Sequence, residues 1–176
     1  MTTVGSYWIR LAQAEELHRL QEIERGAAAL FRETKYEFLA DGAPLPLEFL
    51  LARQRAGAIW VAATAPDEAV GFAVAFPVDG GLHLHELSVA PSHGRQGLGR
   101  RLSEAVCAAG LRDGYDRLTL STFREVPWNG PFYRRLGFVE LPEDALGPGL
   151  REIRRQEAAA GLPLAERACM RRWLQP

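Results

Sequence analysis

The chain has 176 residues, of which 47% are hydrophobic and 24% charged, which is typical of a soluble globular protein with its own core. Its formal net charge is −1, so no overall field favours nucleic acid or an anionic membrane surface. No apolar run approaches the ~20 residues that cross a bilayer, and the amino terminus lacks the basic start and apolar core of a signal peptide. The two cysteines, Cys107 and Cys169, match no metal-ligand spacing and are expected to be buried, reduced thiols. We therefore expect one domain over residues 1–176, cytoplasmic and without nucleic-acid or membrane partners; the sequence does not distinguish a monomer from a homodimer.

The first half of the chain contains short helices between strands and ends in a three-stranded meander. In chain order, we expect a strand over 7–12, a helix from about Ala12, a helical stretch over 26–38, a short helix over 47–55, and strands over 58–64, 69–76 and 82–89. Apolar Leu17, Leu20 and Ile23 recur on one face of the first helix. The turn signals APDE and VDGG separate the three strands, which predicts antiparallel neighbours.

The second half of the chain predicts helices that alternate with further strands. In chain order, these are a helix from about Leu98, a strand over 117–123, a helix over 128–138 that stops at Gly137, a short strand over 138–141, a helix over 150–161 and a last strand over 165–174. A strand–helix–strand unit runs from Leu82 to Phe123, so its two strands should be parallel and joined by a right-handed crossover. The pattern predicts an α+β (mixed α/β) fold with one central, mixed, mostly antiparallel sheet and helices on both faces.

Two histidines lie two positions apart in the predicted strand GLHLHELSV, residues 81–89. Alternate side chains of a strand point to the same face, so the side chains of His83 and His85 should lie on the same face of the sheet. Imidazole titrates near neutral pH without perturbation, so a pair on one face favours proton transfer. The alternative is that one or both rings are structural and hydrogen-bonded beneath a helix. Glu86 should point to the opposite face, unless a bulge changes its direction.

The loop SHGRQGLGRRL, residues 92–102, follows this strand and places Gly97 and Gly99 where the next helix begins. Glycines there let backbone N–H groups approach an anion, and a helix N-terminus favours negative charge. The loop is not a P-loop, because no Gly-Lys-Ser/Thr follows, and the dinucleotide pattern fails at Leu102. Taken alone, the two glycines favour an ordinary loop with solvated arginines over a binding site.

A second motif, WNGPFYRRLGF at residues 128–138, makes the pattern more specific. Together with ELSVAPSHGRQGLGRRL, residues 86–102, it resembles the GNAT family of acetyl-CoA-dependent N-acetyltransferases. The family pattern is a strand ending in Leu-x-Val-x-Pro, a loop Gln/Arg-x-x-Gly-x-Gly/Ala and a later Asn…Phe-Tyr-x-x-x-Gly-Phe, and residues 82–141 match it in order and spacing. One position departs from it, because Gly94 stands where Gln or Arg is usual, and Arg95 is the candidate to replace that phosphate contact.

This resemblance implies a GNAT-like fold with acetyl-CoA as co-substrate. The backbone amides of roughly Arg95 to Arg100 would hold the pyrophosphate, and pantetheine would lie where the strand LSV splays from the parallel strand LTLSTF and would pair with its edge. A backbone N–H near Val89 would polarise the thioester carbonyl. The expected cofactor-binding residues are Leu87, Ser88, Val89, Gly94, Arg95, Gln96, Gly97, Leu98, Gly99, Arg100, Asn129 and Phe132.

The resemblance also implies catalytic roles. An alkyl amine of pKa ~10 is neutral only about one time in a thousand at pH 7, so acetyl transfer to it benefits from a base. His83 and His85 resemble the paired strand histidines of the arylalkylamine N-acetyltransferase branch, which are implicated in deprotonating the amine through water. Glu86 is a competing base, and Tyr133 matches the family tyrosine that protonates the coenzyme A thiolate. No metal is expected.

We therefore expect an enzyme that transfers the acetyl group of acetyl-CoA to a primary amine of a small molecule. Acetylation of a protein lysine or N-terminus is one alternative, and a non-catalytic acyl-CoA-binding sensor module is another. Glu22, Glu24, Glu33 and Asp41 are candidates to attract a cationic amine, because the first two helices help to build the acceptor pocket in this fold. Each of them is more simply a solvated charge, so none is assigned to the site.

Overall fold

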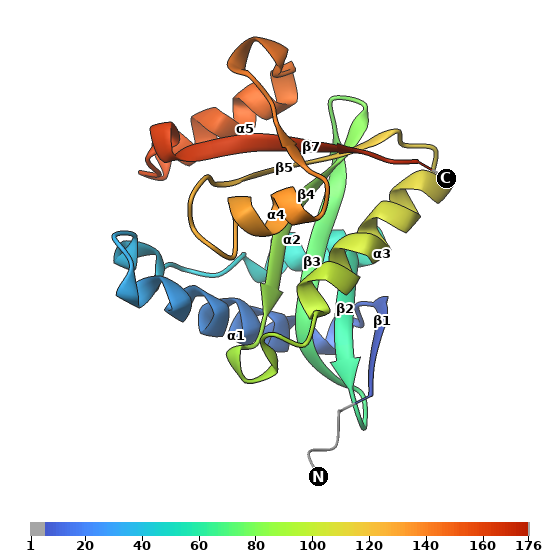
Figure 1. Cartoon of the computed structure of the whole chain (residues 1–176). Helices are drawn as coiled ribbons and strands as arrows, with labels where there is room; N and C mark the ends of the chain where they lie inside the picture. The colour runs from blue at the N-terminus through green and yellow to red at the C-terminus, as the bar shows by residue number, and fades with distance from the viewer. Residues whose placement is uncertain (1–5, 176) are drawn as a thin grey trace. The chain divides into compact units, whose positions relative to one another are not determined.

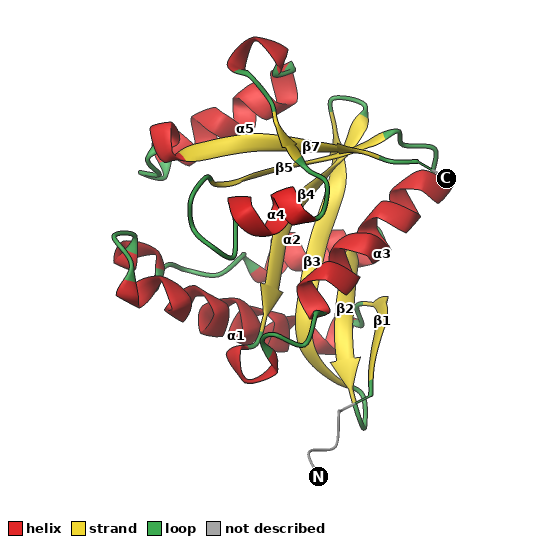
Figure 2. Ribbon diagram, viewed as in Figure 1, coloured by secondary structure: helices red, strands yellow, loops and turns green. Residues whose placement is uncertain are grey.

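A computed structural model describes residues 6–175, whose seven strands form one sheet in the order β1-β2-β3-β4-β5-β7-β6 (Figures 1 and 2). The strands are β1 (Tyr7–Leu11), β2 (Ile59–Thr64), β3 (Glu68–Val78), β4 (Gly81–Val89), β5 (Arg117–Phe123), β6 (Val139–Glu140) and β7 (Arg167–Trp173). The α-helices are α1 (Leu17–Ala28), α2 (Leu47–Arg55), α3 (Leu98–Arg112), α4 (Gly130–Arg135) and α5 (Pro148–Ala159). Within residues 6–175, no helix is long and apolar enough to span a membrane. The predicted mixed α/β fold is confirmed, because β4 and β5 pair in parallel whereas β2 pairs antiparallel with β1 and β3, and β7 with β5 and β6.

The chain divides into two compact units, and strands β3 and β4 and helix α3 each run through both. The first unit comprises the chain up to Val74 together with Glu86–Val106. The second comprises Ala75–His85 together with the chain from Cys107 onward.

In the first unit, β2 pairs antiparallel with β1 and with the first part of β3, and the second of these pairings confirms the one predicted for the first two strands of the meander. The apolar face of α1 is buried as its periodicity predicts, with Leu17, Leu20 and Ile23 at most 3% exposed. The predicted helix over 26–38 does not form as one piece: α1 ends at Ala28, and 3-10 turns follow at Ala29–Glu33 and Glu37–Leu39. Thr34 explains the break, because its Oγ1 donates to the Phe31 carbonyl and accepts from the Tyr36 N–H, in place of helical hydrogen bonds.

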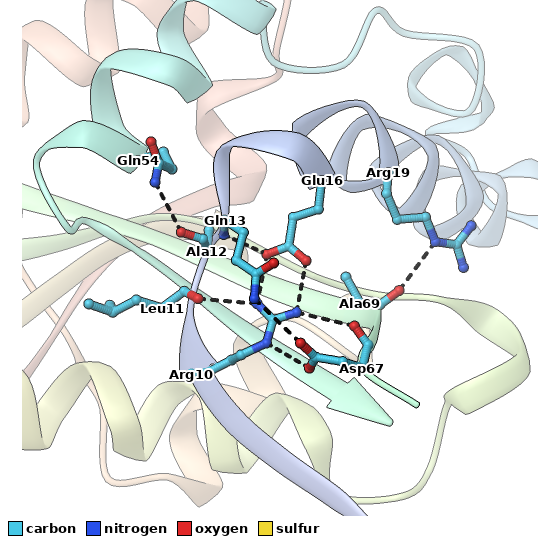
Figure 3. Close-up of polar contacts among 9 residues, drawn as sticks. All are labelled: Arg10, Leu11, Ala12, Gln13, Glu16, Arg19, Gln54, Asp67 and Ala69. Carbon is cyan, nitrogen blue, oxygen red and sulfur yellow. Dashed lines mark hydrogen bonds and ion pairs between the residues drawn. The ribbon is translucent and has the colours of Figure 1, made fainter. Parts of the chain in front are cut away.

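Strand β1 is anchored to its own unit by Arg10 (Figure 3). The Arg10 guanidinium donates to both carboxylate oxygens of Glu16, at 2.8 and 2.9 Å, and to Asp67 at 2.9 Å. Glu16 also accepts from the backbone N–H of Gln13 at 2.8 Å. Because one planar cation meets carboxylates from two other segments, β1, the start of α1 and the β2–β3 turn are held together.

In the second unit, β5 lies between the first part of β4 and β7. The parallel pairing of β4 with β5 covers three residues, Leu82–Leu84 against Leu118–Leu120. The turn after β3 caps α5, since the Asp79 carboxylate accepts from the backbone N–H groups of Gly149 and Leu150 at 2.7 and 2.9 Å. Cys107 and Cys169 are both free and buried, as expected.

Candidate active site

Strand β4 carries the two histidines, and the second unit buries only the first of them. His83 is 1% exposed, and its Nδ1 lies 2.9 Å from Oγ1 of Thr119, its register partner on β5. Burial, and to a lesser extent the charge of His85, lowers the pKa of His83 from 6.5 to about 3, against a smaller opposing effect of Asp79. His83 is therefore a neutral, hydrogen-bonded imidazole at physiological pH.

His85 is exposed, so it is the member of the pair that can exchange a proton with water or a substrate. The Phe76 ring lies against both imidazoles, with centroid distances of 5.2 Å to His85 and 6.2 Å to His83. A shared aromatic neighbour places the two rings on one side of β4, as the strand alternation requires.

Glu86, in the first unit, is half-buried and accepts a hydrogen bond from Ser88 Oγ at 2.7 Å. The charge of Glu86 affects a second carboxyl group, that of Glu24 on α1. Burial, followed by the charge of Glu86, raises the pKa of Glu24 from 4.5 to about 7, although a hydrogen bond from the Leu45 N–H and the charge of Arg25 lower it. Helix α1 does pass close to the end of β4, since a Cβ on Gly26 would lie 3.3 Å from Cδ of Pro91. The charge of Glu86 therefore favours the protonated form of Glu24.

The glycine loop of the first unit joins β4 to α3. Its residues Gly94–Gly97 are exposed, whereas Leu98, which begins the helix, is 1% exposed and anchors it. Arg95 and Gly97 both adopt the left-handed backbone conformation, with φ of 59° and 73°. Such turns aim backbone N–H groups at one point and form anion-binding concavities, and here the loop ends at a helix N-terminus. A left-handed arginine is uncommon and points to a functional constraint.

Helix α4 of the second unit holds Tyr133 in a fixed aromatic environment. Tyr133 is 8% exposed, and its ring packs edge-on against Phe132 and Phe138, at centroid distances of 5.0 and 5.6 Å. Asn129 precedes the helix, and its carbonyl accepts from the Tyr133 N–H at 3.0 Å. Only glycine fits at position 130, because a Cβ there would lie 2.2 Å from the carbonyl oxygen of Arg124.

The expected site residues therefore fall into two groups. The first unit holds Glu86, Leu87–Val89 and Gly94–Arg100, and the second holds His83, His85, Asn129, Phe132 and Tyr133. The sequence does not identify Thr119 as the partner of His83, although a threonine in the apolar run LTL is a polar group that needs a buried partner. It left Glu24 unassigned, although this glutamate continues the apolar stripe of Leu17 and Leu20. Among residues 6–175, no group of three or more His, Cys, Asp or Glu side chains could hold a metal ion.

Comparison with known proteins matches residues 55–140 to the model of the acetyltransferase (GNAT) domain. A GNAT-family acetyltransferase from Staphylococcus aureus Mu50 has a similar structure, with a TM-score of 0.73 and 16% identity over 97% of this chain and 100% of that one. The PaiA N-acetyltransferase from Thermoplasma acidophilum, solved with coenzyme A, gives 0.71 and 17%, covering 96% and 99%. The ribosomal-protein-S18-alanine N-acetyltransferase from Escherichia coli gives 0.67 and 17%, covering 97% and 96%. At these identities the structures establish a shared fold over nearly the whole length of each chain.

Proposed function

We propose that this chain, whose residues 55–140 match the acetyltransferase (GNAT) domain, is an acetyltransferase that uses acetyl-CoA and acetylates a primary amine of a small molecule. The observation that carries the proposal is the exposed imidazole of His85 beside the buried, neutral His83. An amine must lose a proton before it attacks, and an accessible imidazole is a suitable acceptor for that proton near pH 7.

In this proposal the cofactor is held by backbone groups. The N–H groups of the loop Arg95–Arg100 bind the pyrophosphate, and the edge of Leu87–Val89 pairs with the pantetheine amides. The left-handed conformation of Arg95 and Gly97 supports this role, because it turns successive N–H groups toward one side. Arg95 adds the side-chain charge that Gly94 lacks, and Asn129 and Phe132 contact the cofactor from α4.

The reaction that we propose is a direct transfer. His85 accepts a proton from the ammonium group through a water molecule, and the neutral amine nitrogen forms a bond with the thioester carbonyl carbon. Collapse of the tetrahedral intermediate breaks the carbon–sulfur bond, and the departing thiolate takes the hydroxyl proton of Tyr133. The surplus proton on the amide nitrogen leaves through water and restores the tyrosine hydroxyl. His83 acts through His85. Because its ring is neutral, it does not repel a positive charge on His85, and its hydrogen bond with Thr119 fixes the position of the strand.

Glu86 is the second candidate for the base. Its half-buried position supports this role, and so does its negative charge, which raises the pKa of the Glu24 carboxyl. If Glu86 is the base, the pH dependence of the rate belongs to the carboxyl pair and not to the imidazole.

The acceptor class is tested by measuring thiol release from acetyl-CoA with three sets of acceptors: small primary amines, lysine-containing peptides and peptides with a free N-terminus. We expect the highest kcat/KM with a small amine, and a product that carries one acetyl group by mass spectrometry. A higher kcat/KM for either peptide set would make the chain a protein acetyltransferase. Binding of acetyl-CoA without turnover in any set would make it a sensor module.

A further inference from the structure

The first residue of β1, Tyr7, contacts both ends of the glycine loop. Its hydroxyl lies 3.0 Å from Nδ1 of His93, the residue immediately before Gly94, and the two rings meet edge-on at a centroid distance of 5.8 Å. Its carbonyl oxygen accepts a hydrogen bond of 2.8 Å from Nη2 of Arg101, in the first turn of α3. One residue of β1 therefore holds the residues before and after the loop, all within the first unit.

The loop itself has little to hold its shape. Gly94–Gly97 are exposed, and a left-handed arginine such as Arg95 is less stable there than a glycine would be. Across residues 6–175, the two side-chain hydrogen bonds made by residues 91–101 both go to Tyr7. The geometry of the loop therefore depends on Tyr7 and on the local backbone hydrogen bonds.

Tyr7 is itself firmly placed. It pairs with Thr64 of β2 at the start of the β1–β2 ladder, and Arg10, three residues later, fixes β1 to Glu16 and Asp67 (Figure 3). A side chain on an anchored strand can impose a geometry on an exposed loop, and a preorganised loop binds its ligand with a smaller ordering cost.

We propose that Tyr7 is a positioning residue for coenzyme A, which fixes the loop Gly94–Gly97 through His93 on one side and Arg101 on the other. Tyr7 does not touch the cofactor in this arrangement. It sets the directions of the N–H groups that do, so it affects cofactor affinity and not the chemical step. The proposal rests on the loop being the coenzyme A site.

The test is calorimetric titration of the full chain with coenzyme A, together with steady-state kinetics in acetyl-CoA. Tyr7→Phe removes the hydroxyl and keeps the ring, and we expect it to raise the Kd about three- to tenfold, as for the loss of one hydrogen bond. The KM for acetyl-CoA should rise with it, while kcat at saturating acetyl-CoA stays at the wild-type value. His93→Leu should have the same effect, and the double variant should be no weaker than either single one. His93→Asn should restore most of the affinity, because its Oδ1 can take the place of Nδ1.

The matched control is Tyr115→Phe, which removes the hydroxyl of another half-buried tyrosine. In the described part of the chain that hydroxyl makes no hydrogen bond, so the Kd should stay at the wild-type value. Tyr7→Phe with wild-type Kd and KM would overturn the proposal, and so would multiplicative effects in the double variant. Gly97→Val tests the premise separately: if it binds coenzyme A as the wild type does, the loop is not the site and the role of Tyr7 fails with it.

Discussion

His83 and His85 share one side of β4 but differ in their access to water, and this difference decides what each can do. His83 keeps its neutral form because a charge at its buried position would lose its hydration. His85, two residues later, is exposed. The pair thus combines a fixed neutral ring with a ring that can take up a proton, which is the division of roles expected of a positioning group and a base.

The low pKa of His83 predicts a dependence of stability on pH. In the unfolded chain His83 binds a proton below pH ~6.5, whereas in the folded chain it does so only near pH 3, so acid favours unfolding between these values. This residue should remove about 2 kcal/mol of the free energy of unfolding between pH 7 and pH 5. Glu24 acts in the opposite direction, because its raised pKa makes stability fall as pH rises from 4.5 to about 7.

Urea unfolding of the wild type and of His83→Asn at pH 5 and pH 7 separates the two effects, since Glu24 is common to both proteins. The free energy of unfolding at pH 5, taken relative to that at pH 7, should be higher in the variant than in the wild type by about 2 kcal/mol. An equal change in the free energy of unfolding between pH 7 and pH 5 in both proteins would show that His83 is not held neutral.

The proposed role of Tyr133 as the acid can be tested by removing its hydroxyl group. Tyr133→Phe keeps the ring against Phe132 and Phe138 but removes the proton that we assign to the thiolate. We expect kcat to fall by ~10²–10⁴, with coenzyme A binding and thermal stability retained. Tyr115→Phe serves again as the control. Wild-type kcat at both neutral and alkaline pH would reduce Tyr133 to a packing residue.

At the scale of elements, the β4–α3 loop shows how backbone conformation can produce a binding site. Gly97 has a positive φ of 73° and open space around it, so a side chain there would clash with nothing in the protein but would strain the backbone. Gly57, between α2 and β2, has nearly the same geometry, with φ of 66° and equally open space. The two glycines form a matched pair that differs only in location.

We predict that Gly97→Val and Gly57→Val lose similar stability, on the order of 1–2 kcal/mol for a left-handed residue. Only Gly97→Val should lose the rise in Tm that acetyl-CoA produces, since a ligand that binds the native state stabilises it. Thermal unfolding with and without acetyl-CoA checks this. If Gly97→Val keeps the full rise, the loop does not bind the cofactor; if Gly57→Val loses it too, the effect is general destabilisation.

The sequence predicted most elements because their signals are local, such as the alternation in β4 or the stop at Gly137, whose φ is 87°. It failed over 26–38, where side-chain hydrogen bonds of Thr34 replaced helical ones. It also predicted that the histidines share a face but not which one is buried, because burial depends on elements distant in the chain. The effect of Glu86 on the pKa of Glu24 could not be predicted for the same reason, because the two residues lie on β4 and α1, which are distant in the chain.

At the scale of the whole molecule, the fold is shared with acetyltransferases at only 16–17% identity. Such a likeness establishes the architecture, and residues 55–140 match the model of the acetyltransferase (GNAT) domain. The identity of the acceptor and of the catalytic base depends on individual side chains, and similarity of fold does not identify these. The central claim, that β4 supplies the base for acetylation of an amine, therefore needs a test on those side chains.

The most direct test is the pH dependence of kcat/KM for the best small amine, measured for the wild type, His85→Gln and Glu86→Gln. We predict that kcat/KM rises with pH in the wild type and Glu86→Gln, and that His85→Gln flattens this rise while acetyl-CoA binding survives. If His85→Gln keeps the wild-type rise and rate while Glu86→Gln loses them, the imidazole pair is structural, and the carboxyl pair of Glu24 and Glu86 is the base.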